Sequence, residues 1–273
     1  MDIWAANAAI ETCHALLNEK RCNGCGGGLK TGVDLGTASI VITVVDNNNV
    51  PVAAVMEEAS VVRDGVVVDY IGATRIVERL KEQVEGIVGQ ALNRAACAIP
   101  PGITEGNIKV ISNVVESADF EVDNVVDEPT AAATVLGITD GAVVDVGGGT
   151  TGISIIRNGR VVLTADEPTG GTHMSLVLAG ALKISFEAAE AMKKMPRYER
   201  DVFPVVRPVV QKMASIVKRF ITGYDVETIY VVGGACCFTR FEAEFEQEIG
   251  VKTMKPVHPL LVTPLGIAMN CRG

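Results

Sequence analysis

A short glycine turn between two β-branched segments occurs twice in this chain of 273 residues. The first copy reads "VDLGTAS" at positions 33–39, and the second reads "VDVGGGTTG" at positions 144–152. In both copies an apolar run leads to an aspartate, then to glycine and threonine, and a second apolar run follows. An internal repeat of a strand–turn–strand unit predicts two related α/β halves.

The residues of these turns favour phosphate binding. Glycine lets a ligand approach the backbone, and successive N–H groups in a tight turn attract anions. Thr37, Thr150 and Thr151 add hydroxyl donors. No Gly-Lys-Ser/Thr follows and the next segment is β-branched, so neither a Walker loop nor a Rossmann turn is predicted. Two ordinary hairpins with aspartates in their turns are the alternative.

A polyphosphate held by backbone amides also needs a cation. Asp34 and Asp145 stand at the ends of the predicted strands, directly before the two turns. Carboxylates in such positions hold Mg²⁺ through its water shell. The two turns together therefore predict a site for a polyphosphate with Mg²⁺.

The remaining periodicity alternates between strand and helix. Turn signals at Asp64-Gly65 and Asn158-Gly159 predict hairpins, and Gly137 is expected to end a short helix. The helical spacing predicts helices at 3–20, 71–93, 105–118, 173–183, 185–195, 204–222 and at the "TPLGIAMN" segment near the end.

Composition excludes several classes of protein. The formal net charge is −9 and no long Lys/Arg cluster occurs, which argues against nucleic acid and against an anionic membrane surface. No run approaches the roughly 18 apolar residues of a membrane span. The N-terminus lacks the basic region of a signal peptide, so a cytoplasmic location is expected.

Seven cysteines in a chain of this length do not indicate a disulfide framework. Cys22-Asn-Gly-Cys25 has the spacing of a metal or redox site, completed by Cys13 or His14. The alternative is two thiols in a turn before the first strand. A role for the adjacent Cys236 and Cys237 is not predicted, beyond small residues beside a turn.

Five segments, in order, resemble the ATPase superfamily of actin, sugar kinases and heat-shock chaperones. They are "GVDLGTAS", "DEPTAAA", "VVDVGGGTTGISI", "IYVVGGACCFTRFEAEF" and "PLGIAM", which together span residues 32–270. This resemblance implies an actin-like α/β fold with two ribonuclease-H-like lobes and reduced small subdomains. It implies a helix and Gly/Cys linker over 1–29, a first lobe over 30–140 with 262–273 returning to it, and a second lobe over 141–261.

At a finer level the chain resembles the EutJ family of ethanolamine-utilisation proteins, in "VVRDGVVVDYIGA", "VVDEPTAAA", "ADEPTGGTHMSLVLAG", "KISFEAAE" and "VTPLGIA". That family is described as chaperone-like and is encoded with ethanolamine degradation and its protein-shelled microcompartment. The resemblance implies a cytoplasmic protein associated with that compartment.

The superfamily resemblance implies ATP and Mg²⁺ as cofactors and gives each matched residue a role. Asp34 and Asp145 would position Mg²⁺ and its waters, and Glu128 would orient the attacking water. Glu190 and Lys193 would contact ribose and adenine, or else form a solvated pair on a helix. The residues implied in cradling phosphates or adenosine are Gly36, Thr37, Gly147, Gly148, Gly149, Thr150, Gly170, Gly171, Gly233, Gly234 and Ala235.

Some features depart from the chaperone pattern. Ala38 replaces a second threonine, nothing between Asp46 and Ala95 resembles the insertion with the catalytic lysine, and residues 187–222 leave little room for a small lobe. No counterpart of the peptide-binding domain follows. We therefore expect a weak ATPase or nucleotide binding without turnover.

Three functions compete on this basis. The first is a nucleotide-switched chaperone or reactivating factor for an enzyme of ethanolamine degradation, such as its cobalamin-dependent lyase. The second is an actin-like scaffold or filament, and whether copies of the chain assemble is left open. The third, a small-molecule kinase, needs an acceptor site with an aspartate base, and residues 46–126 offer no good candidate.

Overall fold

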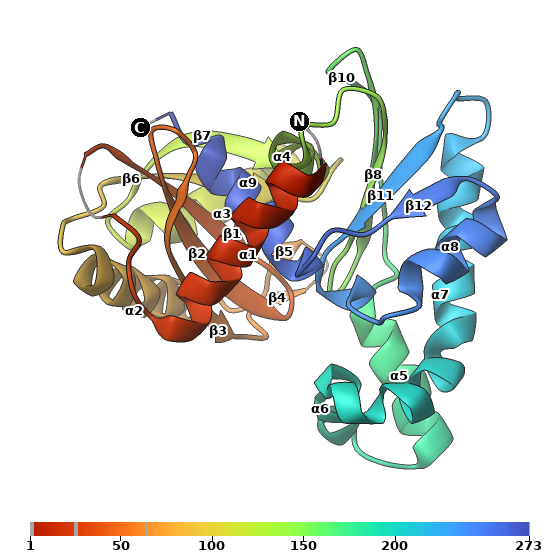
Figure 1. Cartoon of the computed structure of the whole chain (residues 1–273). Helices are drawn as coiled ribbons and strands as arrows, with labels where there is room; N and C mark the ends of the chain where they lie inside the picture. The colour runs from red at the N-terminus through yellow and green to blue at the C-terminus, as the bar shows by residue number, and fades with distance from the viewer. Residues whose placement is uncertain (1–2, 25–26, 64, 273) are drawn as a thin grey trace.

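The computed structural model describes residues 3–24, 27–63 and 65–272. Each half of the chain forms one five-stranded sheet, and the two sheets stand side by side (Figure 1). The first sheet has the order β3-β2-β1-β6-β7. Its strands are β1 (Leu29–Leu35), β2 (Ser39–Asp46), β3 (Pro51–Glu58), β6 (Arg94–Ile99) and β7 (Glu121–Asp127).

The second sheet repeats this topology with the order β10-β9-β8-β11-β12. Its strands are β8 (Gly141–Val146), β9 (Thr151–Arg157), β10 (Arg160–Glu167), β11 (Thr228–Val232) and β12 (Lys252–Met254). The first strand of each half pairs antiparallel with the next strand and parallel with the fourth. The two glycine turns therefore occupy equivalent places, between β1 and β2 and between β8 and β9.

Helices cover both faces of the first sheet. On the outer face, α2 (Tyr70–Val88) and α3 (Glu105–Ser117) share one apolar core with the strands. On the inner face, α1 (Ile3–Glu19), α4 (Glu128–Leu136) and α9 (Val262–Met269) form a core that also includes residues of β8 and β11. This inner layer is what joins the two halves.

The contact between α4 and α9 depends on small residues. A Cβ atom at Gly266 would lie 1.9 Å from the carbonyl oxygen of Ala131, so the two helices cross with their backbones in contact. A Cβ atom at Gly32 would lie 2.3 Å from the amide nitrogen of Ala268, so α9 lies equally close to β1. The helix α9 thus packs on the sheet of the first half.

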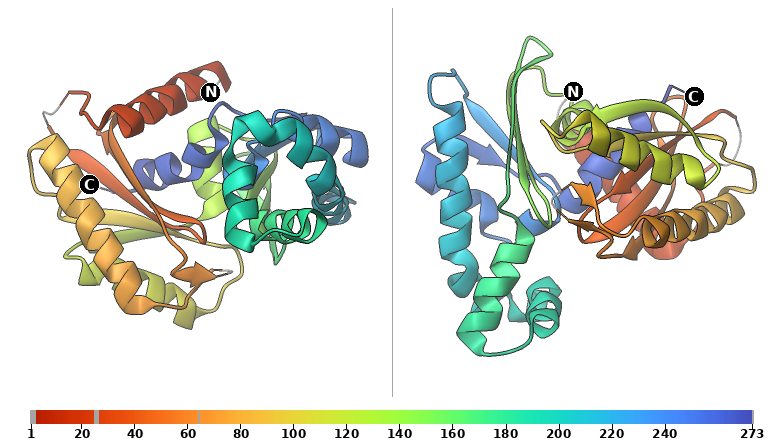
Figure 2. Two further views of the ribbon diagram at one scale, coloured as in Figure 1. Left: turned by 90° about the horizontal axis from the view of Figure 1, so that it is seen from below. Right: turned by 180° about the vertical axis from the view of Figure 1, so that it is seen from behind.

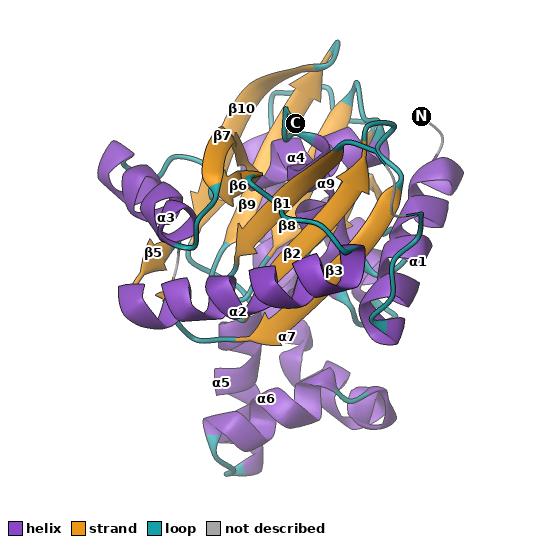
Figure 3. Cartoon of the chain, turned by 90° about the vertical axis from the view of Figure 1, so that its left-hand side faces the viewer, coloured by secondary structure: helices purple, strands orange, loops and turns teal. Residues whose placement is uncertain are grey.

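The second half carries a helical projection. Its helices are α5 (Gly171–Leu182), α6 (Phe186–Lys194), η1 (Pro196–Tyr198), α7 (Glu199–Ile221), η2 (Gly234–Cys236), α8 (Phe241–Ile249) and η3 (Pro259–Leu261). Figures 2 and 3 show α5 and α6 extending beyond the end of the second sheet. In the first half, a small two-stranded hairpin of β4 (Val62–Arg63) and β5 (Val66–Val67) forms a separate sheet.

Most predicted elements are present, with some shifted bounds. The hairpin at Asn158-Gly159 forms, with φ of 51° and 69°, and Gly137 ends α4 with φ of 63°. Gly65 also has positive φ, whereas Asp64 lies outside the described residues.

The predicted start of a helix at residue 204 is wrong, because α7 begins at Glu199 and contains Pro204 and Pro208. Proline is disfavoured inside helices, but the apolar face of α7, which buries Val202 and Phe203, extends across this point. Among the described residues, no helix is long and apolar enough to cross a membrane.

Candidate functional site

The two glycine turns meet where the halves of the molecule face each other. A Cβ atom at Gly148 would lie 3.2 Å from Cβ of Thr37 and 3.3 Å from Cβ of Ala38. The turn after β1 and the turn after β8 are therefore in contact. The sequence predicts phosphate-binding residues on both turns, and the fold brings those turns to one point.

The N-terminus of α5 packs on the second turn. The amide groups of Gly171 and Thr172 donate to the carbonyl oxygens of Gly147 (2.9 Å) and Gly148 (2.8 Å). A Cβ atom at Gly170 would lie 2.6 Å from the oxygen of Gly148 and 2.7 Å from that of Gly147, so only glycine fits there. These bonds fix the shape of the turn and direct a helix N-terminus toward it.

Three carboxyl groups gather beside the turns. Asp34 and Asp145 stand near the ends of β1 and β8, and Glu128 is the first residue of α4. The carboxylate of Asp127 accepts a hydrogen bond from the amide of Thr130 (3.0 Å) and caps α4, which fixes where Glu128 begins the helix.

The pKa of each of these three carboxyl groups is raised. Burial and the charge of Asp145 raise the pKa of Asp34 to about 7. Burial also raises the pKa of Asp145 to about 6, although the hydroxyl of Thr263, which donates to Oδ2 at 2.5 Å, acts in the opposite direction. Burial, and then the charges of Asp145 and Asp34, raise the pKa of Glu128 well above its ordinary value.

This cluster fits a magnesium ion. Three neighbouring carboxyl groups destabilise one another's ionised forms, and a divalent cation with oxygen ligands removes that repulsion. Asp34 and Asp145 are the residues that would hold it, and the glycines of the turns carry no side chains that would keep phosphate oxygens from the backbone amides.

The loop after β11 borders the same region. Gly233 has φ of 92°, and a Cβ atom there would lie 2.4 Å from Oδ1 of Asp145. A Cβ atom at Gly171 would lie 3.2 Å from both Cβ of Ala235 and Nζ of Lys193. The predicted adenosine-side residues therefore adjoin the start of α5 and the second glycine turn. Gly234 is the next residue of this loop and faces Leu260.

Lys193 and Glu190 form a partly buried pair, which contradicts the alternative of a solvated helix pair. The ammonium group of Lys193 donates to Glu190 Oε2 (2.7 Å), Ser175 Oγ (2.8 Å) and the carbonyl oxygen of Gly171 (2.8 Å). Only 10% of the Lys193 side chain is exposed. Burial lowers the pKa of Lys193. The pair thus ties α6 to the first turn of α5.

Two residues of this region, Thr263 and Ser175, are not predicted from the sequence. Thr263 holds Asp145 from the start of α9, and Ser175 links Lys193 to α5. Thr263 lies in the "VTPLGIA" segment that resembles the family, but the resemblance gave this residue no role. The hydroxyl of Thr151, predicted as a phosphate donor, donates here to the carbonyl oxygen of Thr169 (2.6 Å) and holds the turn.

The surroundings of Cys13 and Cys236 do not indicate a metal or redox site. Cys25 lies outside the described residues, so the Cys22-x-x-Cys25 prediction stays untested. Cys13 is buried in the inner core and burial raises its pKa to about 12, which disfavours the thiolate that a metal needs. Cys236 is buried beside the adenosine-side turn and its thiol donates to Gly233.

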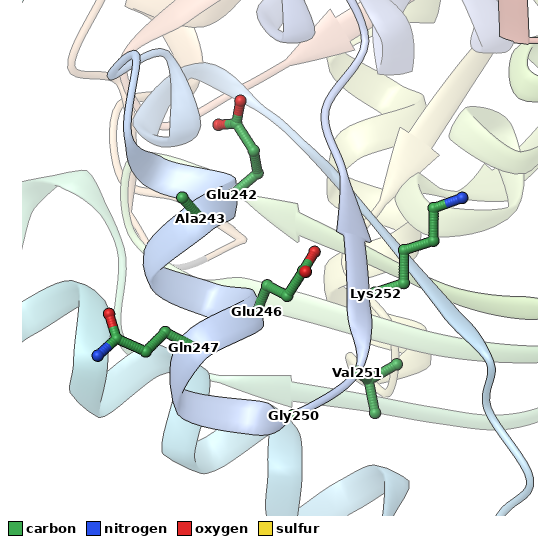
Figure 4. A pocket seen from close by; sticks show the side chains of 7 residues that line it. All are labelled: Glu242, Ala243, Glu246, Gln247, Gly250, Val251 and Lys252. Atoms are coloured by element: carbon green, nitrogen blue, oxygen red, sulfur yellow. The ribbon is translucent and has the colours of Figure 1, made fainter.

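An open hollow between α8 and β12 lies elsewhere in the second half (Figure 4). Its carboxylates are already used, because Glu242 pairs with Lys255 (2.7 Å) and Glu246 accepts from the amide of Thr253 (3.0 Å). These bonds hold α8 against the β12 segment. The two carboxylates of this hollow therefore serve to hold the fold together, and we assign no catalytic or binding role to it.

Two related sheets, two facing glycine turns and acidic residues between them define an actin-like ATPase fold. Family models agree with this class: Hsp70 protein matches residues 68–194 and cell division protein FtsA matches residues 142–253. MreB 5 of Spiroplasma citri shares the fold, with a TM-score of 0.68 and 17% identity over 87% of this chain and 94% of that one.

Within this class the chain belongs to the EutJ family of ethanolamine-utilisation proteins. It is 46% identical to EutJ of Salmonella typhimurium, covering 89% of this chain and 85% of the relative. The crystal structure of EutJ from Carboxydothermus hydrogenoformans superposes with a TM-score of 0.94 and 49% identity, covering 98% of this chain and 99% of that one. The family resemblance noted from the sequence is confirmed.

Proposed function

We propose that this protein binds ATP with Mg²⁺ between its two halves, hydrolyses it slowly, and uses the resulting movement to act on a client protein. The observation that carries the proposal is the cluster of Asp34, Asp145 and Glu128 beside two facing glycine turns. Such a cluster is costly without a cation, and the turns are suited to phosphate. The MreB 5 relative was solved bound to AMPPNP, which supports this assignment.

The client is proposed to be an enzyme of ethanolamine degradation, such as its cobalamin-dependent lyase, at the microcompartment. The membership in the EutJ family supports this choice. Lobes that close on ATP and reopen after hydrolysis would supply the switch.

Asp145→Asn is the variant that tests nucleotide binding. Mg-ATP binding and phosphate release are measured for the wild type, this variant and Asp225→Asn, whose side chain is 84% exposed in the same half. We expect Asp145→Asn to weaken both by roughly 10–100-fold, the effect of losing a group that orients metal-bound water. Asp225→Asn should match the wild type.

The result that overturns the proposal is a wild type that does not bind Mg-ATP, or an Asp145→Asn variant that binds it equally well. The purified lyase is then added to the wild type, and stimulated phosphate release is expected. If ATP instead causes sustained light scattering and the lyase has no effect, an actin-like filament replaces the switch.

The ion pair of Lys194 with Glu58 links the two halves. Nζ of Lys194 on α6 lies 2.8 Å from Oε1 of Glu58 at the end of β3. The glycine turns are in contact in this conformation, so nucleotide entry requires them to separate, and the pair opposes that movement.

We expect Glu58→Gln to speed the association of a fluorescent ATP analogue by about 1.5- to 5-fold, the range for an exposed ion pair. Stopped-flow mixing measures this rate. Glu57→Gln is the matched control, because Glu57 pairs with Arg79 within the first half. An unchanged or slower association for Glu58→Gln would show that the pair does not restrain opening.

A further inference from the structure

Two of the three histidines of the chain come together outside the glycine turns. His14 lies on α1, and His258 lies in the segment that leads from β12 to η3. Their rings are stacked, with centroids 3.5 Å apart and planes 10° apart. Oε2 of Glu11, three residues before His14 on α1, lies 3.0 Å from Nε2 of His258.

We propose that Glu11, His14 and His258 bind a divalent transition-metal ion such as Zn²⁺. One ligand atom from each residue can be chosen so that all lie within 4.8 Å of one another. Ligand atoms around a zinc ion lie at most about 4 Å apart, since each bond is about 2.0–2.2 Å long. Metal binding would therefore require the two imidazoles to turn about their side-chain bonds, out of the stacked arrangement.

The donor set decides the class of ion. Two imidazoles and one carboxylate suit zinc, cobalt, nickel or copper, whereas magnesium and calcium prefer sites built from oxygen alone. The site is thus chemically distinct from the carboxylate cluster of Asp34, Asp145 and Glu128. It does not depend on the proposed binding of ATP.

Other contacts already hold the ligands near one another. The amide of Val257 donates to Asn7 Oδ1 (3.1 Å), which attaches the segment to α1. The side-chain nitrogen of Asn18 lies 3.1 Å from Nε2 and 3.4 Å from Nδ1 of His14, so it contacts the imidazole from the same helix and would turn away when a ring nitrogen binds the ion. His258 has φ of 40°, a left-handed conformation that is unfavourable for a residue other than glycine.

An ion at this place would link two parts of the fold that are far apart in the sequence. The Glu11 side chain is 64% exposed, so an ion from solvent can reach the site and keep water ligands. The carbonyl oxygen of Pro259, next to His258, accepts from the amide of Gly233 (2.9 Å). A bound ion would fasten α1 to the segment that runs from the second sheet to α9 and supports the adenosine-side turn.

Titration with Co²⁺ tests this site, because cobalt bound by protein ligands absorbs visible light. The full chain is freed of metal with a chelator, and Co²⁺ is added to the wild type, His14→Gln, His258→Gln and Glu11→Gln. His173→Gln is the matched control, since His173 is the third histidine and lies on α5. We expect one Co²⁺ per chain, displaced by Zn²⁺, with binding weakened at least tenfold in the three site variants and unchanged in the control.

A second readout guards against variants that misfold. Circular dichroism without metal must match the wild type, and Zn²⁺ should raise the melting temperature of the wild type and not of His14→Gln. His14→Gln suffices if His258→Gln does not fold. The proposal is overturned if the wild type binds neither ion, if the site variants bind as well as the wild type, or if an intense near-ultraviolet band shows that cysteine thiolates hold the cobalt.

Discussion

Exchange of Glu128 for glutamine is expected to slow phosphate release from Mg-ATP by roughly 10²–10⁴-fold, the range for loss of a general base. Glutamine keeps the size of the side chain and its place at the start of α4, which the Asp127 cap fixes independently. The exchange removes the carboxyl group of Glu128. The pKa of this group is raised, and a general base is most effective when its pKa lies near the working pH. Binding of Mg-ATP should stay within a few-fold of the wild type.

Single-turnover phosphate release and equilibrium nucleotide binding separate these two effects. Glu121→Gln, at the opposite end of β7 and mostly exposed, is the matched control and should behave as the wild type. If Glu128→Gln loses nucleotide binding together with turnover, the residue has a structural role. If turnover is unchanged, another group orients the attacking water.

Exchange of Asp34 for asparagine is expected to stabilise the metal-free protein at alkaline pH. The folded pKa of Asp34, about 7, lies above its value in the unfolded chain. The contribution of this group to stability is therefore complete below about pH 4 and is lost as pH rises toward and through 7. Asparagine avoids that loss, so we expect the variant to be more stable than the wild type by about 1–3 kcal/mol at pH 8, and by little near pH 4.

Thermal and urea unfolding over this pH range, in a chelating buffer, measure the difference. Acidic groups away from this cluster change the pH profile of both proteins equally. The charge of Asp34 also raises the pKa of Glu128, so relief of that effect adds to the gain in stability of the variant. Addition of Mg²⁺ should raise the melting temperature of the wild type more than that of the variant, because the cation removes the same repulsion. A variant less stable than the wild type at pH 8 would show that the ionised carboxylate is already compensated in the metal-free fold.

Features that depend on neighbouring residues could be predicted from the sequence. The repeated glycine turns lie at equivalent places in two sheets of the same topology, because a strand–turn–strand pattern specifies its own hairpin. Gly137 ends α4 for a similarly local reason, since glycine accepts the positive φ of a helix end. The start of α7 was predicted too late, because local proline chemistry was given more weight than burial of the apolar face.

Contacts between distant segments were decided only by the tertiary structure. Thr263 reaches Asp145, Ser175 reaches Lys193, and His258 stacks on His14 because packed helices and sheets bring these segments together. The sequence by itself determined the class of fold and the equivalent places of the two glycine turns in it. It could not specify which hydroxyl, carboxylate or imidazole meets which, because that depends on how α1, α4 and α9 pack between the sheets and not on spacing along the chain.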